Sequence, residues 1–216
     1  MTCYDLTHAL ETGMPVYPGS PPAVVERAAT IDDGARVTRL DLETHVGTHV
    51  DAPSHMARDG ASLDDFDVER FRFDALRVDC THLGAREPIS PSDLPSPTDH
   101  DLLAFHTGWD DHWGTDAYRD HPYLSDAAAE WCADNGYSVG LDAFSPDPTP
   151  SVDPDREGPD EPEGYPAHDA LFEAESFIVE NLTNLDAPPA EFTLLAFPLA
   201  IVDADGSPVR AVADAG

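Results

Sequence analysis

The chain has no lysine and little positive charge of any kind. Its 216 residues include 43 acidic side chains against 11 basic ones, all of them arginine, and the net charge is -32 at pH 7. Proteins that bind nucleic-acid phosphates or anionic lipids need clustered positive charge, so we expect neither nucleic acid nor a membrane as a partner. The acidic residues are spread among hydrophobic segments. This distribution predicts adaptation to molar salt inside the cell, as in halophiles, and argues against a disordered acidic tail.

Cysteine pairs and long apolar runs are also missing. The three cysteines, Cys3, Cys80 and Cys132, are widely spaced and form no Cys-x-x-Cys pair, which favours a reducing compartment. The N-terminus shows no basic region followed by an apolar stretch, so no signal peptide is evident. No apolar run reaches the ~18 residues of a membrane-spanning helix. These absences predict a cytoplasmic protein, and the length predicts one domain over residues 1–216.

One short segment is rich in metal-binding side chains: His-Val-Gly-Thr-His-Val-Asp-Ala-Pro-Ser-His, which begins at His45. Imidazole and carboxylate groups suit divalent zinc or manganese. His49 and Asp51 are two residues apart, so on a strand they share a face at a separation of about 7 Å. His45 lies roughly 13 Å from His49 along an extended strand, so the chain must bend at Gly47 if all three are to bind one ion. His55 follows on a loop at the rim, where it is free to move protons. The alternative is a polar strand edge with incidental histidines.

Hydrophobic periodicity predicts a mixture of strands and a few helices. The alternation from Val37 to Val50 predicts one long strand. Further strands are expected at 75–81, 102–106, 137–142, 177–180 and 192–197, and helices at 126–134 and 167–174. Ser125 is the expected N-cap of the first helix. Asp205-Gly206 predicts the turn of a C-terminal hairpin. This mixture indicates an α/β or α+β fold.

A long segment between two of these elements has almost no apolar content. Residues 145–166 are rich in proline, aspartate and glutamate. We expect a solvated acidic insertion there. A lid over the site, or an arm that contacts a second subunit, is the alternative, since long ordered loops are often functional.

The segment that begins at His45 resembles the signature His-x-Gly-Thr-His-x-Asp-x-Pro-x-His of the metal-dependent cyclase and kynurenine formamidase family, with every fixed position matched. Shorter matches lie on both sides of this signature, in the order that the family has them, at 5–8, 14–19, 106–108, 140–145, 168–171, 180–182 and 206–211. The resemblance therefore covers nearly the whole chain. It implies an α/β architecture, the swivelling β/β/α fold, with a central barrel-like mixed sheet and a few flanking helices. It also implies assembly as a homodimer or homotetramer.

The resemblance adds further residues to the site. It implies a second set of metal ligands, His168 and Glu180, and a buried carboxylate such as Glu180 needs a partner of this kind. Asp51 and Glu180 would then bridge two ions. Tyr17 stands before Pro-Gly, where kynurenine formamidases carry tryptophan, and is the candidate substrate-binding residue; a core aromatic near a turn is the alternative. Asp142 matches a family segment near the site and is a candidate for orienting a metal histidine; a purely structural role is the alternative.

These residues together imply a hydrolase that acts on C–N bonds other than peptide bonds and uses one or two divalent ions, zinc or manganese. The expected substrate is a small amide, N-formylkynurenine, which is cleaved to kynurenine and formate in tryptophan breakdown. His55 would act as the general acid/base. Three alternatives stay open. They are a sibling cyclic-amide hydrolase such as an isatin hydrolase, a metal-binding protein without turnover, and an acidic cation buffer with many weak sites.

Overall fold

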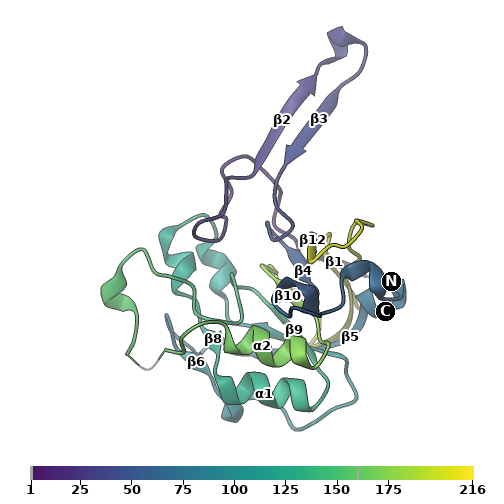
Figure 1. Cartoon of the computed structure of the whole chain (residues 1–216). Coiled ribbons are helices and arrows are strands. Elements are labelled where there is room, and N and C mark those ends of the chain that lie inside the picture. The colour runs from purple at the N-terminus through teal and green to yellow at the C-terminus, as the bar shows by residue number, and fades with distance from the viewer. Residues whose placement is uncertain (1, 160) are drawn as a thin grey trace.

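A mixed sheet of nine strands forms the frame of the protein (Figure 1). The computed structural model describes residues 2–159 and 161–216. The sheet runs in the order β1-β13-β11-β5-β7-β9-β10-β4-β12. Its strands are β1 (Cys3–Asp5), β4 (His49–Asp51), β5 (Arg72–Asp79), β7 (Leu102–His106), β9 (Ser138–Leu141), β10 (Ile178–Glu180), β11 (Glu191–Leu195), β12 (Gly206–Pro208) and β13 (Val212–Asp214). The four central strands β5, β7, β9 and β10 are parallel, and the flanking pairs are antiparallel. An α/β fold with a mixed sheet is therefore confirmed.

The sheet curls so that its two ends approach each other. β12 is the last strand in the order and β13 the second, yet only residues 209–211 join them. A link of this length spans at most about 14 Å, whereas seven strand spacings in a flat sheet would cover about 34 Å. The predicted C-terminal hairpin is wrong, because β12 pairs with β4 while β13 pairs with β1 and β11. The turn signal at Asp205 depends on neighbouring residues only, whereas the partners of β12 and β13 are determined by the curl of the whole sheet.

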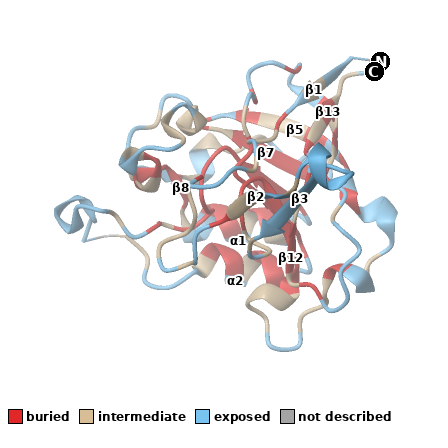
Figure 2. Ribbon diagram, turned by 90° about the horizontal axis from the view of Figure 1, so that it is seen from above, coloured by how far each residue is buried: buried red, intermediate tan, exposed pale blue. Residues whose placement is uncertain are grey.

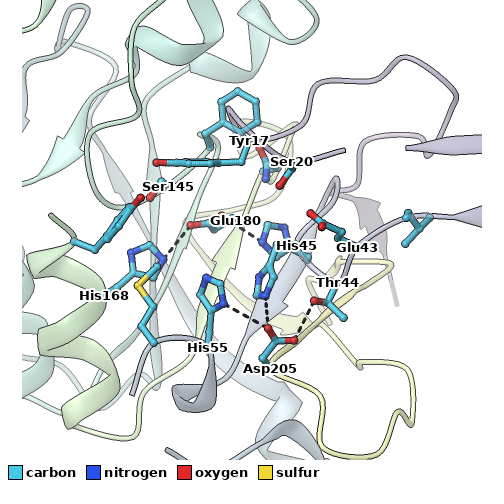
Figure 3. A pocket seen from close by; sticks show the side chains of 16 residues that line it. Tyr17, Ser20, Glu43, Thr44, His45, His55, Ser145, His168, Glu180 and Asp205 are labelled. Carbon is cyan, nitrogen blue, oxygen red and sulfur yellow. Dashed lines mark hydrogen bonds and ion pairs between the residues drawn. The ribbon is translucent and has the colours of Figure 1, made fainter. Parts of the chain in front are cut away.

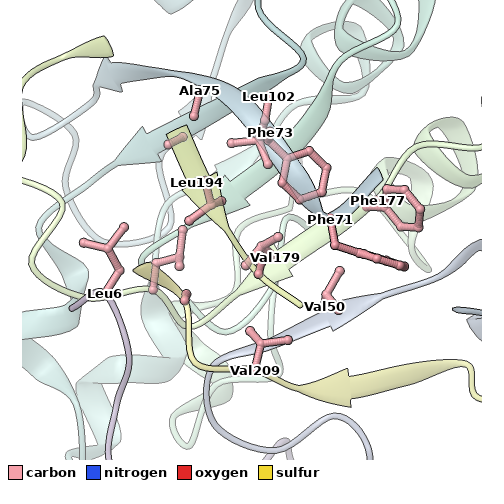
Figure 4. Packing of buried hydrophobic residues seen from close by; sticks show 14 of the residues in the cluster. Leu6, Val50, Phe71, Phe73, Ala75, Leu102, Phe177, Val179, Leu194 and Val209 are labelled. Atoms are coloured by element: carbon pink, nitrogen blue, oxygen red, sulfur yellow. The ribbon is translucent and has the colours of Figure 1, made fainter. Parts of the chain in front are cut away.

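Both faces of the central strands are buried, as expected for a parallel sheet. Along β7, Leu102 and Ala104 enter one apolar cluster, and Leu103 and Phe105 enter a second one on the opposite face. The first cluster fills the concave side of the curled sheet (Figure 4). The second is covered by α1 (Asp126–Asp134) and α2 (Pro166–Glu173). Both helices match their predicted positions, and the Ser125 side chain accepts a hydrogen bond from the Ala128 amide as the expected N-cap.

A two-stranded hairpin projects from this body (Figure 1) and is seen end-on in Figure 2; we call it the arm. It consists of β2 (Val24–Ala29) and β3 (Val37–Asp41), which pair with each other and with no other strand of the described chain. All five residues of β3 are exposed. The long strand predicted from Val37 to Val50 is therefore wrong. The alternating pattern is real, but its first half faces solvent in the arm and only β4 lies in the main sheet.

The remaining elements are short. β6 (Pro88–Ile89) and β8 (Tyr123–Leu124) form a second two-stranded pair. Turns of 3₁₀ helix lie at Ile31–Asp33, Pro53–His55, Leu63–Asp65, Val68–Phe71, Pro91–Asp93, Trp109–His112, Asp116–Asp120 and Pro154–Arg156. None of the helices in the described part of the chain has the length and apolar character needed to cross a membrane.

The acidic segment 145–166 differs from the solvated insertion that we expected. Residues 152–159 are exposed, but Ser145, Asp147 and Thr149 are almost completely buried. Arg86 ties the middle of the segment to the body, since it pairs with Glu161 and donates to the Thr149 carbonyl. The composition suggested solvent exposure, but the polar side chains at the start of the segment point inward and make hydrogen bonds with the body.

Candidate metal centre

A cavity of about 570 Å³ opens where β4 and β10 meet the start of α2 (Figure 3). Six of the seven predicted site residues line it, namely Tyr17, His45, His49, His55, His168 and Glu180. The seventh, Asp51, lies directly behind its wall with 1% of its surface exposed. The structure therefore brings together residues that come from four separate parts of the sequence.

The pairing of β4 with β10 sets the centre of the site. His49 stands opposite Glu180 in the antiparallel register, and His49 and Asp51 share a face of β4. His49 Nε2 lies 3.2 Å from Asp51 Oδ1 and 3.3 Å from Glu180 Oε2. The His49 ring is fixed from behind, because its Nδ1 donates to the Gly47 carbonyl over 2.8 Å. The two-residue spacing in the sequence thus produces the expected convergence.

The chain bends between His45 and His49, as their spacing required. Gly47 has a φ of 66°, which is in the left-handed region that favours glycine. A Cβ at this position would also lie 2.9 Å from the side chains of Leu10 and Met14. After the bend, His45 Nδ1 donates to Asp51 Oδ1 over 2.6 Å. His45 therefore joins the group on β4 instead of lying a strand length away.

His168 enters from the first turn of α2. Its Nε2 lies 3.6 Å from Glu180 Oε1, and its Nδ1 donates to Asp147 Oδ2 over 2.6 Å. Burial disfavours the charged imidazolium, but the hydrogen bonds to Asp147 and Glu180 outweigh it and raise the pKa of His168 to about 10. Asp142, the expected orienting residue, instead accepts hydrogen bonds from the amides of Thr107 and Gly108. That expectation is corrected, because Asp147 and not Asp142 contacts the ring.

His55 and Asp205 lie together at the mouth of the site (Figure 3). The rings of His45 and His55 are 3.8 Å apart at their centroids. Asp205 Oδ2 is 3.1 Å from His45 Nε2 and 3.6 Å from His55 Nδ1, and its other oxygen accepts from the Thr44 hydroxyl. Burial lowers the pKa of His55. The sequence marked Asp205 only as a turn residue, so its place in the site was missed.

Tyr17 belongs to the wall of the cavity, together with Phe144 and Tyr165. Its ring meets the edge of Phe144 at a centroid distance of 6.4 Å. Burial and the hydrogen bond to Tyr165 raise the pKa of Tyr17. The aromatic side chain before Pro-Gly therefore faces the cavity, as expected, and is not part of the core.

The donor set fits a divalent metal ion. Two groups of ligand atoms, His45–His49–Asp51 and Asp51–His168–Glu180, each lie within 4.8 Å of one another. His49 Nε2 and Asp51 Oδ2 are buried and lack a hydrogen-bond partner in the described structure. Unpaired buried polar atoms are costly, and a cation would satisfy both. Burial opposes a charged His49, but Asp51 still holds the pKa of His49 well above its usual value, so the carboxylates already draw positive charge to this point.

Comparison with known proteins identifies the family of this chain. The model of the Cyclase family, described as "Putative cyclase", matches residues 4–148, and the chain belongs to this family. The chain is 34% identical to a kynurenine formamidase of Erythrobacter litoralis, over 97% of this chain and 92% of that one. It is 31% identical to a kynurenine formamidase of Salinibacter ruber, over 98% of this chain and 97% of that one.

Solved structures show the same fold. Isatin hydrolase A from Labrenzia aggregata, bound to benzyl benzoate, superposes with a TM-score of 0.82 at 24% identity, over 98% of this chain and 93% of that one. A protein of Bacillus stearothermophilus described as a "predicted metal-dependent hydrolase" gives a TM-score of 0.78 at 27% identity, over 98% and 97%. The fold implied by the sequence resemblance is thus confirmed.

Proposed function

We propose that this protein is a metal-dependent hydrolase that cleaves N-formylkynurenine to kynurenine and formate. The observation that carries the proposal is the convergence of His49, Asp51 and Glu180 at a cavity, where His49 Nε2 lies within 3.3 Å of both carboxylates but makes no hydrogen bond in the described structure. Kynurenine formamidases that match this chain over nearly its full length support the choice of substrate.

The proposed ligands form two sets that share Asp51. His45, His49 and Asp51 make the first set, and Asp51, His168 and Glu180 the second, which allows one or two ions. Nitrogen and carboxylate donors suit zinc, and manganese as a second choice. A divalent ion held here supplies Lewis acidity, which lowers the pKa of water and withdraws charge from a carbonyl oxygen.

His55 is the proposed proton carrier. It lies beside the ligands, yet its side chain keeps 25% of its surface exposed. Asp205 approaches the Nδ1 side of the ring, so Nε2 is the nitrogen left for the substrate. As water adds to the formyl carbon, His55 takes up a proton, and it then gives the proton to the departing aryl nitrogen. Such general acid/base catalysis contributes about 10²- to 10⁴-fold in rate.

The cavity wall supports an aryl substrate. Tyr17, Phe144 and Met56 line the same cavity as the histidines and present aromatic or flexible apolar surface to it. A flat aromatic ring gains contact area and favourable edge or face interactions against such side chains. We propose Tyr17 as the main substrate contact. Because it stands where related formamidases carry tryptophan, the ring-opening of a cyclic amide such as isatin is the second candidate reaction.

The test is formate release in molar KCl from metal-stripped protein to which zinc or manganese is added back. Rapid, metal-dependent formate release from N-formylkynurenine, and little ring-opening of isatin, is the expected result. The reverse preference would replace this substrate by a cyclic amide. Turnover of neither substrate by folded, metal-loaded protein would reject the proposed reaction and leave a metal-binding protein.

His55→Ala is the matched variant for the mechanism. It removes the proton carrier but none of the five proposed ligands, so we expect zinc content equal to that of the wild type and turnover reduced about 10²- to 10⁴-fold. Zinc content measured by atomic absorption and turnover measured on the same sample separate the two effects. Full activity in this variant would remove His55 from the mechanism.

We also propose that the chain is cytoplasmic and assembles as a homodimer or homotetramer. An isolated two-stranded hairpin is at best marginally stable in water, and the arm exposes Ile31, Val37 and Leu40 at 72%, 48% and 56%. A second copy that packs against the arm would cover these side chains. Light scattering in molar KCl should give a dimer or tetramer, with Leu40→Asp shifted toward monomer; a monomeric wild type would contradict the proposal.

A further inference from the structure

Two of the three proposed metal-binding histidines, His49 and His168, donate from one ring nitrogen to an oxygen atom of this chain. His49 Nδ1 donates to the Gly47 carbonyl, and His168 Nδ1 donates to Asp147 Oδ2. His45 differs, because both of its nitrogens contact carboxylates: Nδ1 lies 2.6 Å from Asp51 Oδ1 and Nε2 lies 3.1 Å from Asp205 Oδ2. A neutral imidazole that carries its proton on one nitrogen presents a lone pair on the other. The acceptors of His49 and His168 therefore determine which nitrogen each of these two rings offers to the centre of the site.

Among these acceptors, Asp147 has the most complete set of contacts. It is fully buried, with 0% of its surface exposed. Its Oδ1 accepts from the Ala167 amide over 2.8 Å, and its Oδ2 accepts from the His168 amide over 3.1 Å and from His168 Nδ1 over 2.6 Å. The carboxylate is thus fixed by the backbone of the same helical turn that carries the His168 ring, so the two groups move as one unit.

The other neighbours of the His168 ring cannot replace this carboxylate. The ring lies against Phe172 at a centroid distance of 5.5 Å and against Tyr165 at 6.0 Å, both in edge-on arrangements. These contacts restrict where the ring lies but offer Nδ1 no strong acceptor. Among the contacts that the structure describes for this ring, it is the hydrogen bond to Asp147 that specifies that Nδ1 carries the proton and that Nε2 faces Glu180.

We propose that Asp147 is a positioning residue of the metal centre, which fixes His168 with Nε2 presented to the ion. This inference rests on the proposed metal site but not on the identity of the substrate. Carboxylates that hold a metal-binding histidine through its second nitrogen also raise its strength as a ligand, and their loss typically costs about 10- to 100-fold in metal affinity.

Asp142 provides a matched control in the same connecting segment. It is also fully buried and accepts hydrogen bonds from the Thr107 amide, the Thr107 hydroxyl and the Gly108 amide. No histidine donates to it in the part of the chain that the structure describes. Asp142→Asn therefore removes a buried carboxylate of the same kind and depth without touching a metal-binding ring.

The experiment measures the zinc affinity of the full-length protein by competition with a chromogenic chelator in molar KCl. Asp147→Asn keeps one of the two acceptor oxygens but loses the charge, and it should weaken zinc binding about 10-fold; Asp147→Ala should weaken it toward about 100-fold. Asp142→Asn should keep wild-type zinc affinity even if its melting temperature falls. Circular dichroism at the same salt concentration confirms that each variant is folded before the titration.

The outcomes separate this inference from the proposed reaction. Zinc affinity that is unchanged in both Asp147 variants, or lowered equally by Asp142→Asn, would overturn the positioning role. Absence of tight zinc binding in the wild type would overturn it together with the metal site. Failure of the wild type to release formate bears only on the substrate, because the affinities are measured without any substrate present.

Discussion

At the scale of single residues, Gly206 leaves the space that the imidazole ring of His45 occupies. A Cβ on Gly206 would lie 2.5 Å from His45 Cε1 and 3.0 Å from Nδ1. The ring cannot yield easily, because Asp51 and Asp205 hold it from both sides. We predict that Gly206→Ala displaces the ring and weakens zinc binding by about 10-fold or more, in the range found when ligand orientation is lost. Chelator competition measures the effect.

Gly84→Ala is the control for that substitution. A Cβ on Gly84 would meet its nearest neighbour, the Glu87 side chain, at 3.7 Å, which is an ordinary contact, and neither residue lines the cavity. Neither glycine has a positive φ, so alanine strains the backbone at neither position. Zinc affinity should stay at the wild-type value in Gly84→Ala. Equal affinity in the Gly206 variant would show that the His45 ring has room to move.

The residues of the site differ in how far they could be predicted from the sequence. His45, His49 and Asp51 form a dense local motif whose geometry can be calculated from strand spacing. Glu180 comes from a distant strand, and only the family resemblance pointed to it. Asp147 is one of 43 acidic residues in the chain, so a single aspartate carries no signal by itself. Its role depends on the fold, which brings residues 147 and 168 together.

At the scale of secondary-structure elements, local sequence signals predicted the structure correctly where neighbouring residues determine it. The helix at Asp126–Asp134 has its N-cap at Ser125 and ends before Gly136, which has a φ of 75°. Both capping signals involve residues that are close together in the chain, so they can be recognised in the sequence. The arm and the C-terminal strands depend on long-range pairing instead. Alternation shows which residues share a face but not what that face contacts.

The acidic segment 145–166 is anchored by a buried histidine, which leads to a prediction on pH. His121 Nδ1 donates to the Pro122 carbonyl, and its Nε2 accepts from the Thr149 hydroxyl over 2.8 Å. Burial lowers the pKa of His121 to about 4 from 6.5, although the charges of Glu180 and Asp120 oppose this and that of Arg86 adds to it. The unfolded chain therefore takes up a proton first as the pH falls. The contribution of His121 to the stability of the folded protein is complete above pH 6.5 and is lost as the pH falls to about 4.

We predict that His121→Asn removes this part of the pH dependence. One proton taken up on unfolding changes the free energy of unfolding by roughly 1.4 kcal/mol per pH unit. Urea unfolding in molar KCl, repeated across that pH window, should give a shallower slope for the variant than for the wild type. Parallel slopes for His121→Asn and wild type would contradict the assignment.

At the scale of the whole molecule, the curl of the sheet assembles the site. It brings β12 beside β4, with Gly206 opposite Asp51. Asp205, the residue just before β12, therefore lies beside His45 and His55 although 150 or more residues separate them in the sequence. No local pattern encodes that closure. It follows from the order of all nine strands, which explains why sequence reasoning missed Asp205 but found the motif on β4.

The net charge of -32 is the other property of the whole molecule. Few cations offset it. Four arginines pair with acidic partners, namely Arg39, Arg86, Arg156 and Arg210, and the remaining acidic side chains repel one another. The range of that repulsion is the Debye length, about 3 Å at 1 M salt and about 30 Å at 0.01 M. In dilute buffer the acidic side chains therefore repel one another across the whole molecule, which destabilises the compact state.

We predict that the protein is folded in about 1 M KCl and loses its structure on dialysis to about 0.01 M. Circular dichroism follows the loss, and a return of the signal when KCl is restored shows that unfolding is reversible. A chelator present throughout keeps bound metal from masking the effect, since ligand binding stabilises the folded state by mass action. Sucrose in place of KCl should not restore the fold fully, because it does not screen charge. Unchanged ellipticity at the low salt concentration would show that the acidic composition is not an adaptation to molar salt.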